Sequence, residues 1–294
     1  MTATETETGV LAGEQRMLID GELQFTDSGA TFDVVHPASE QVAGQATDGT
    51  VEDMGRAVGA ARRAFDETDW SRDVDFRYHC LTQLHEALER NKERLRRILI
   101  TEVGCPPVSV SGSQIESPIE EVRHWAEHGK NFDYLVDNGV HDTPPLGGPA
   151  RRKIHYEAVG VVGGAITPWN VPFYLNVAET VPALMAGNTV VLKPAQLTPW
   201  SGSEYGRIVA EETDIPAGGV FNVVVSNSNE VGAALSADPR VDMITFTGST
   251  ATGRAILAAG AATVKKTLLE LGGASPPTSC STTPTSTPRC RWPR

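Results

Sequence analysis

Cysteine is scarce in this 294-residue chain, which has four: Cys80, Cys105, Cys280 and Cys290. They are scattered along the sequence, without a CxxC pair and without histidine at a metal-binding spacing. Structural zinc sites need such clusters, so the sequence predicts no metal centre. We expect the thiols to be reduced.

Long apolar runs and an excess of positive charge are also missing. No apolar run approaches the roughly 18 residues of a membrane span, and residues 1–10, MTATETETGV, have no basic segment before an apolar one, as a secretory signal has. Lys and Arg number 25 against 37 Asp and Glu, a net charge of −12, which disfavours nucleic acid and anionic membranes as partners. We therefore expect a cytoplasmic protein that binds neither.

The basic stretch at residues 92–97 has two interpretations. It resembles a nucleic-acid patch in composition, but Glu89 and Glu93 are interleaved with it. Alternating charges are typical of a solvated helix face, and this interpretation is favoured.

The rest of the composition is that of an ordinary globular protein, with 40% hydrophobic and 21% charged residues. The length suggests about two domains. Before residue 157, the pattern predicts short antiparallel strands, then three helices, a Gly/Pro loop and an exposed strand. Their ranges are 17–35 for the strands, 50–65, 74–102 and 114–135 for the helices, 139–149 for the loop and 151–156 for the last strand.

After residue 170 helices and strands alternate regularly. The predicted helices span 172–186, 199–212, 229–237 and 250–262, and the predicted strands 189–193, 220–225, 243–247 and 266–271. Strand, helix, strand at this spacing indicates a parallel sheet with crossover helices. The predicted fold class is therefore α/β: a Rossmann-like open parallel sheet with flanking helices, N-terminal helices and a small β extension.

Residues 157–170, EAVGVVGGAITPWN, form the centre of this pattern. They read as a buried strand that ends abruptly in polar residues, and the carboxyl ends of strands are where open α/β sheets bind ligands. The segment GVVGGAITPWNVP resembles the strand, turn and helix that open the cofactor domain of the aldehyde dehydrogenase superfamily. The resemblance implies that Ile166, Thr167, Pro168 and Trp169 shape the cofactor wall. It also implies that Asn170 donates a hydrogen bond to the substrate oxyanion, whereas local sequence alone favours Asn170 as a helix cap.

The segment FTGSTATG, residues 246–253, is the second motif. Gly248 permits a tight turn, and Ser249 can cap a helix whose free N–H groups face an anion. Many strand-to-helix turns have this form without a ligand. The segment is similar to the superfamily's pyrophosphate-binding motif, which implies that Gly248 and Ser249 lie near the dinucleotide and that Gly253 serves helix packing.

Lys193 and Gln196 lie in the third motif, VVLKPAQLTP. Lys193 ends an apolar strand, so it is either a solvated strand end or a ligand-binding cation. In the superfamily this lysine contacts the adenine ribose, and a glutamate three residues later shares that contact. Gln196 stands in place of the glutamate, and a neutral amide repels a 2′-phosphate less than a carboxylate does. The cofactor is therefore predicted to be NAD or NADP, with NADP tolerated.

Glu270, in LLELGG, resembles the superfamily's general base. Glycines follow the strand that carries it, which lets the side chain swing as a base beside a bulky cofactor must. Burial between Leu269 and Leu271 would raise its pKa toward neutrality. By the same resemblance Leu271 is assigned to the cofactor site. The predicted catalytic residues are Glu270 and Asn170.

The resemblance covers residues 20–273 and then stops. Of the last 21 residues, 274–294, 14 are Pro, Ser or Thr, so we expect a disordered tail. Neither Cys280 nor Cys290 has the surroundings of the superfamily's nucleophile, and we interpret the change of composition as a frameshift or premature gene end. The predicted organisation is a flexible N-terminus (1–16), a dinucleotide-binding domain (17–273) with oligomerisation strands near 150–157, and this tail.

These features predict an NAD(P)-dependent aldehyde dehydrogenase, acting on an aldehyde substrate, whose present chain is an incomplete enzyme. Another βαβ nucleotide binder is one alternative, but Gly160, Gly163 and Gly164 have the wrong spacing for a Rossmann fingerprint. A non-catalytic dinucleotide-binding or subunit-interaction protein is the other alternative. Homo-oligomers, or pairing with a full-length relative, are the expected assemblies.

Overall fold

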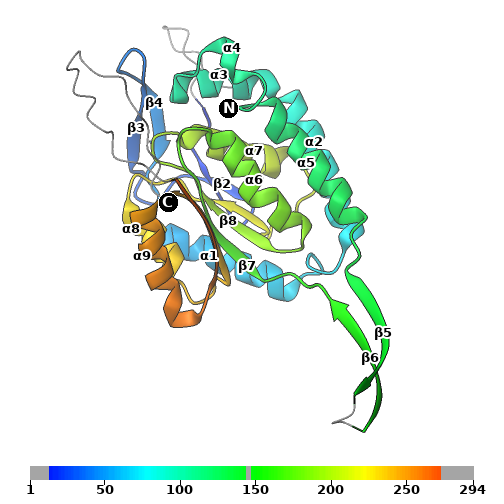
Figure 1. Ribbon diagram of the computed structural model, residues 1–294. Coiled ribbons are helices and arrows are strands. Elements are labelled where there is room, and N and C mark those ends of the chain that lie inside the picture. The colour runs from blue at the N-terminus through cyan, green and yellow to red at the C-terminus, as the bar shows by residue number, and fades with distance from the viewer. Residues whose placement is uncertain (1–12, 144–146, 273–294) are drawn as a thin grey trace, which may run out of the picture.

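A seven-stranded sheet forms the centre of the protein, with strand order β11-β10-β7-β8-β9-β1-β2 (Figure 1). The computed structural model describes residues 13–143 and 147–272. The strands are β1 (Met17–Ile19), β2 (Glu22–Gln24), β7 (Val161–Ile166), β8 (Thr189–Lys193), β9 (Phe221–Val223), β10 (Met243–Ser249) and β11 (Lys266–Gly272). The strands from β11 to β9 run parallel, and β1 and β2 add an antiparallel edge. The predicted parallel α/β sheet is confirmed.

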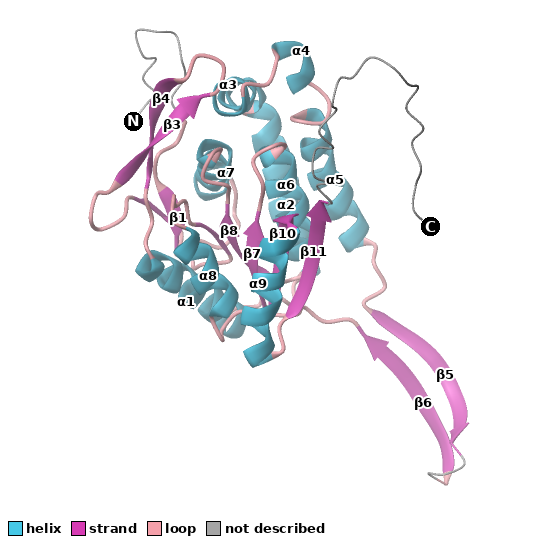
Figure 2. Cartoon of the chain, turned by 60° about the vertical axis from the view of Figure 1, so that its left-hand side comes forward, coloured by secondary structure: helices cyan, strands magenta, loops and turns pink. Residues whose placement is uncertain are grey.

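Helices cover both faces of this sheet (Figures 1 and 2). On one face lie α1 (Val51–Glu67), α8 (Asn229–Ala237) and α9 (Thr250–Gly260), followed by the short η2 (Ala261–Thr263). On the other lie α6 (Pro172–Met185) and α7 (Pro199–Glu212), with α2 (Val74–Arg90), α3 (Lys92–Val103), α4 (Pro107–Val110) and α5 (Glu116–Lys130) outside them. Every residue of β8 is buried between the two layers, as expected for a continuous apolar strand in a parallel sheet.

Helix α1 begins where the sequence places its capping box. The Thr50 hydroxyl accepts the Asp53 N–H at 3.2 Å, and the Asp53 carboxylate accepts the Thr50 N–H at 2.8 Å. This exchange satisfies backbone donors that a helix start leaves free. Predicted and observed starts of the helix therefore coincide.

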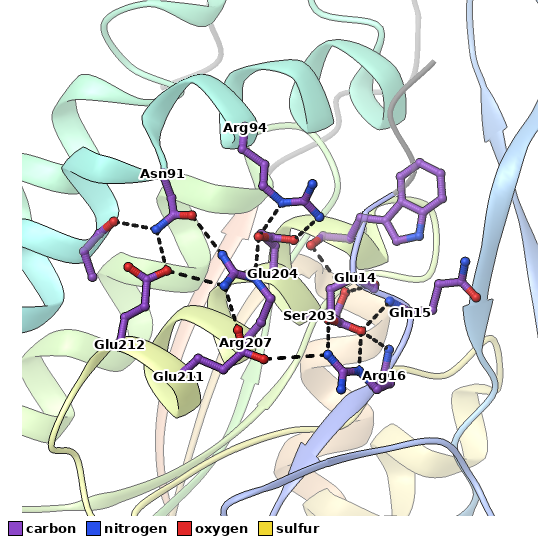
Figure 3. A network of polar contacts seen from close by, with 12 residues as sticks. Glu14, Gln15, Arg16, Asn91, Arg94, Ser203, Glu204, Arg207, Glu211 and Glu212 are labelled. Atoms are coloured by element: carbon purple, nitrogen blue, oxygen red, sulfur yellow. Dashed lines mark hydrogen bonds and ion pairs between the residues drawn. The ribbon is translucent and has the colours of Figure 1, made fainter. Parts of the chain in front are cut away.

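The single helix predicted over 74–102 is wrong, because the chain breaks at Asn91 into α2 and α3. The Asn91 side chain donates to Ala87 O and to Glu212, each at 2.8 Å, and accepts from Arg207 at 2.9 Å (Figure 3). An asparagine side chain that bonds to the backbone competes with the hydrogen bonds that would continue a helix. Here the contacts with Glu212 and Arg207 hold the Asn91 side chain in the position that breaks the helix. The third helix also ends earlier than predicted, at Lys130 instead of residue 135.

Beside this break, a buried ion cluster joins α3 to α7 (Figure 3). Glu204 is fully buried and accepts from Arg94 at 2.7 Å and from Arg207 at 2.8 Å. Both arginines remain partly solvated. A buried carboxylate with two guanidinium partners fixes the packing of these helices.

Two small antiparallel sheets lie outside the core: β3 (Thr31–His36) with β4 (Gln41–Thr47), and β5 (Leu135–Thr143) with β6 (Gly148–His155). The second pair forms an arm that projects from the body (Figures 1 and 2). The loop predicted at 139–149 is therefore wrong in its described part. Gly139, with φ +77°, accommodates a register irregularity between Asp137 and Val140, and Pro149 pairs with Asp142 on the exposed arm. The exposed strand predicted from residue 151 is confirmed.

In the described ranges, no helix is both long and apolar enough to cross a bilayer. The predicted tail and most of the predicted flexible N-terminus lie outside the described residues.

Candidate functional site

The predicted site residues converge on one edge of the sheet because their strands end together. Ile166 of β7 pairs with Lys193 of β8 and also with Phe246 of β10. On the other side of β10, Gly248 pairs with Leu271 of β11. The turns after these strands therefore share the carboxyl edge, where an open parallel sheet offers a ligand site.

Lys193 is buried, so it is not a solvated strand end. Its side chain passes Gly232 of α8, where an added Cβ would lie 3.5 Å from Lys193 Cδ. Its ammonium lies 3.5 Å from Pro194 O, and no carboxylate of the described residues forms an ion pair with it. Burial lowers the pKa of Lys193 to about 8, while the charge of Asp48 opposes that shift. A buried cation with so few polar partners among the described residues fits a ligand that brings hydroxyl or anionic oxygens.

Helix α9 begins with a side-chain N-cap. Ser249 is the N-cap, and its hydroxyl accepts the Thr252 N–H at 3.1 Å. At Gly248 an added Cβ would lie 2.5 Å from the Phe246 ring, so a side chain there would displace Phe246. The helix N-terminus next to this crowded strand end is suited to an anion. Gly253 packs against β11, since its Cβ would lie 2.7 Å from Leu271 Cδ2, which confirms the packing role expected for it.

The turn after β7 does not use Asn170 as a helix cap, so that interpretation is wrong. The N-cap of α6 is Val171, without a side-chain hydrogen bond, because the turn places Asn170 one residue earlier. Asn170 is exposed, and its backbone oxygen accepts from Gln114 at 3.3 Å. Thr167 is buried and donates to Asn176 at 2.6 Å, whereas Trp169 is 56% exposed. The side-chain amide of Asn170 is therefore accessible to a ligand at the carboxyl edge of the sheet.

The burial expected for Glu270 is not observed, because β11 is the outer strand of the described sheet. Glu270 is exposed, and Leu271 is 36% exposed although it touches α9. Gln196 is also exposed, in the turn between β8 and α7. The catalytic and cofactor roles of these three residues remain predictions.

Comparison with known proteins identifies the family. The aldehyde dehydrogenase family model matches residues 25–279. The chain belongs to the aldehyde dehydrogenase family. It is similar to aminoacetaldehyde dehydrogenase of Pseudomonas aeruginosa, with 36% identity over 264 residues, 89% of this chain and 51% of the relative. It is also similar to lactaldehyde dehydrogenase of Escherichia coli, with 31% identity over 260 residues, 88% of this chain and 52% of the relative.

Solved aldehyde dehydrogenases have the same fold. A mutant of aldehyde dehydrogenase C from Pseudomonas syringae, crystallised with NAD+ and octanal, superposes with a TM-score of 0.80 at 34% identity, over 92% of this chain and 52% of that one. Betaine aldehyde dehydrogenase of Staphylococcus aureus with NAD+ gives 0.81 at 30% identity, over 89% and 50%. The chain thus spans about half the length of the relatives it matches.

The two cysteines in the described part of the chain are poor nucleophiles. Cys80 is buried in α2, where desolvation raises the pKa of its thiol to about 12. Cys105 follows α3, and burial raises the pKa of its thiol as well. Because the thiolate is the nucleophilic form, neither thiol is activated, and neither belongs to the strand ends described above.

One carboxylate near the site, that of Glu179 on α6, is not among the residues predicted from the sequence. It accepts hydrogen bonds from Thr245 at 2.9 Å and from Thr247 at 2.7 Å, both on β10. Desolvation raises the pKa of Glu179 to about 7, the two hydroxyls lower it, and the charge of Glu270 raises it further. A signal exists in the sequence, since Asn176 and Glu179 are three residues apart on a helix that begins at the site.

Proposed function

We propose that this chain is the dinucleotide-binding part of an NAD(P)-dependent aldehyde dehydrogenase and that it binds NAD or NADP at the carboxyl edge of the sheet. The observation that carries this proposal is the convergence of Lys193, the N-terminus of α9 and Asn170 on that edge through strand register. These groups fit the cofactor by chemistry: a buried cation with no ion-pair partner among the described side chains, and a helix start suited to a diphosphate. The relatives crystallised with NAD+ support the assignment.

Within this proposal, the chain's residues have distinct roles. Lys193 hydrogen-bonds the ribose hydroxyls, while Gly248 and Ser249 allow the diphosphate to approach the start of α9. The turn formed by Ile166, Thr167, Pro168 and Trp169 supplies the cofactor wall, and Leu271 completes it near the base. Gln196 lacks the charge that would repel a 2′-phosphate, so NADP is accepted. When bound, the dinucleotide supplies the hydride acceptor for aldehyde oxidation.

Two side chains act in the chemical steps, one on the substrate and one on a water molecule. The exposed Asn170 amide donates a hydrogen bond to the aldehyde oxygen as negative charge develops on it. Glu270, exposed at the end of β11, removes a proton from the water that releases the carboxylic acid. Neither Cys80 nor Cys105 supplies the thiolate that attacks the aldehyde, and neither Cys280 nor Cys290 has the sequence surroundings of the superfamily's nucleophile. We therefore propose that the 294-residue chain, assayed by itself, binds cofactor without turning over aldehyde.

Calorimetric titration with NAD and NADP tests the binding site. Replacing Lys193 by Met removes the buried cation and should weaken binding of both cofactors about tenfold or more, equivalent to about 1.4 kcal/mol. Lys266→Met is the matched control, because Lys266 is an exposed lysine at the amino end of β11. Equal affinities of the wild type and Lys193→Met would refute the site. An aldehyde panel assayed with the same preparation tests the second statement, which turnover by the chain alone would refute.

A second candidate role is subunit interaction through the β5–β6 arm. The arm exposes apolar side chains, with Leu135 at 56%, Val140 at 65% and Ile154 at 43%. Isolated strands that expose apolar residues favour pairing with another chain. Size-exclusion chromatography with light scattering, with and without a full-length relative, tests this role. A monomer that does not co-elute with the relative would remove it.

A further inference from the structure

A second carboxylate lies on the same side of the sheet as Glu270. Glu179 projects from α6 toward β10, where its two oxygens accept from the Thr245 hydroxyl at 2.9 Å and the Thr247 hydroxyl at 2.7 Å. Thr245 and Thr247 are two positions apart on the strand, so their side chains share one face. The α6-facing side of β10 therefore holds the Glu179 carboxylate in place.

Strand register places Glu270 beside this group. Thr247 of β10 pairs with Glu270 of the parallel strand β11, and paired residues on neighbouring strands lie about 4.8 Å apart on the same face. The opposite face of β11 is identified independently, because Leu271 touches Gly253 of α9. Alternation along the strand then directs Glu270 toward α6. Glu179, Thr247 and Glu270 thus form a row across β10 and β11.

We propose that Glu179 is a positioning residue for Glu270 and receives the proton that Glu270 takes from water, with the Thr247 hydroxyl between them. This rests on the proposed function, which makes Glu270 the base. In the transfer, protonated Glu270 gives its proton to the Thr247 oxygen as the Thr247 hydroxyl proton moves to Glu179. One O–H bond forms and one breaks at Thr247, no electrons are exchanged, and Glu270 returns to its carboxylate form.

The electrostatics of the row suit this role. Burial raises the pKa of Glu179 to about 7, the two threonine hydroxyls act against that shift, and the charge of Glu270 adds to it. A group with a pKa near neutrality both accepts and releases protons readily. Among the described residues, no cation forms an ion pair with Glu179 or Glu270. Lys266, on the same face of β11, is four residues from Glu270, about 13 Å along the strand.

Carboxyl-carbon NMR titration of chain labelled with carbon-13 at glutamate tests the coupling, with the Glu179 signal assigned from Glu179→Gln. In Glu270→Gln the like charge is removed, so the pKa of Glu179 should fall by about 0.5 or more. In Thr247→Val a donor to the carboxylate is lost, so the pKa should rise, and Thr247→Ser should restore it because the hydroxyl is retained. A generally lower stability would not produce these opposite shifts.

Glu67→Gln is the control, since Glu67 is an exposed carboxylate at the end of α1 on the other face of the sheet, and it should leave the Glu179 titration unchanged. A Glu179 titration that is the same in the wild type and in Glu270→Gln would overturn the proposal. A pKa of Glu179 in the ordinary glutamate range would also overturn the proposal. If Thr247→Val fails to fold, Glu270→Gln still decides. The titration needs neither cofactor nor aldehyde, so its outcome is separable from the Lys193→Met binding result.

Discussion

The stability of the fold should fall as pH rises from 4.5 to 7 because of one carboxyl group, that of Glu102 on α3. Glu102 is 3% exposed, and its two oxygens accept the Trp200 N–H at 2.8 Å and the Ser201 N–H at 3.0 Å. These amides open α7, whose own N-cap, Thr198, makes no side-chain capping bond. Glu102 therefore caps α7 from another helix. No cation of the described residues pairs with it, so only the two amides and the helix dipole act in favour of its charged form.

The sign and size of the effect follow from the protonation of Glu102. Burial raises its pKa from 4.5 to about 7, although the two N–H groups and the Ser201 hydroxyl act in the opposite direction. The folded state therefore holds the proton more tightly than the unfolded chain does. This contribution to stability is fully present below pH 4.5 and is lost as pH rises through about 7. A pKa difference of about 2.5 corresponds to about 3 kcal/mol.

Urea unfolding of the wild type and Glu102→Gln between pH 4.5 and 8 measures how much the protonation of Glu102 contributes to the free energy of unfolding. Glutamine does not titrate, so the stability of the wild type relative to the variant should fall by about 3 kcal/mol over that range. Glu179 titrates in the same direction in both proteins and cancels in the difference. Glu93→Gln, on the same helix but 77% exposed, is the control and should give a difference that is flat within about 0.5 kcal/mol. A flat difference for Glu102→Gln would refute the reasoning.

Three further substitutions test other contacts. Gly253→Val forces a side chain against Leu271 and should destabilise the fold by about 1–3 kcal/mol in urea unfolding, with Gly253→Ala less affected; equal stabilities would show that α9 and β11 are not in close contact. Glu204→Leu leaves Arg207 and a second arginine without their buried partner and should cost about 3 kcal/mol or more, and a loss below 1 kcal/mol would mean that solvent replaces the pairing. Gln196→Glu should lower NADP affinity relative to NAD in calorimetric titration, and an unchanged ratio of dissociation constants would contradict the proposed effect of the amide.

The parts of the fold that the sequence predicts well are those with a local physical cause. Strand β8 occupies its predicted range because an apolar run is bounded by Asn188 and Pro194. The start of α1 follows from the reciprocal bonds of Thr50 and Asp53. The break at Asn91 was not predictable, because the side chains that hold it belong to α7, more than a hundred residues later.

The candidate site also has features that the sequence predicts and features that it does not. Residues at strand ends, such as Lys193 and Ser249, are predictable as neighbours because parallel strands bring their carboxyl ends to one edge. Whether each of these residues is buried or exposed is not predictable from the sequence. Lys193 is buried beside α8, and Glu270 is exposed because β11 is the outer strand of the described sheet, and both facts depend on which element covers which face.

Three buried or half-buried carboxylates show why the pH dependence of this protein could not be predicted from its sequence. In the sequence Glu102, Glu179 and Glu204 are each an acidic residue on a helix, which normally indicates a solvated position. Each accepts a hydrogen bond from a residue far away in the sequence, at a separation of 98 residues for Glu102, 66 for Glu179 and 110 for Glu204. These partners, more than the helical pattern, determine what each carboxylate does: Glu204 joins two arginines, Glu102 caps a helix, and Glu179 lies beside Glu270. Because the pKa of a group depends on its burial and charged neighbours, protonation behaviour in this protein is a property of its tertiary contacts. The pH experiments therefore test the packing of α3, α6 and α7 more directly than substitutions in the motifs would.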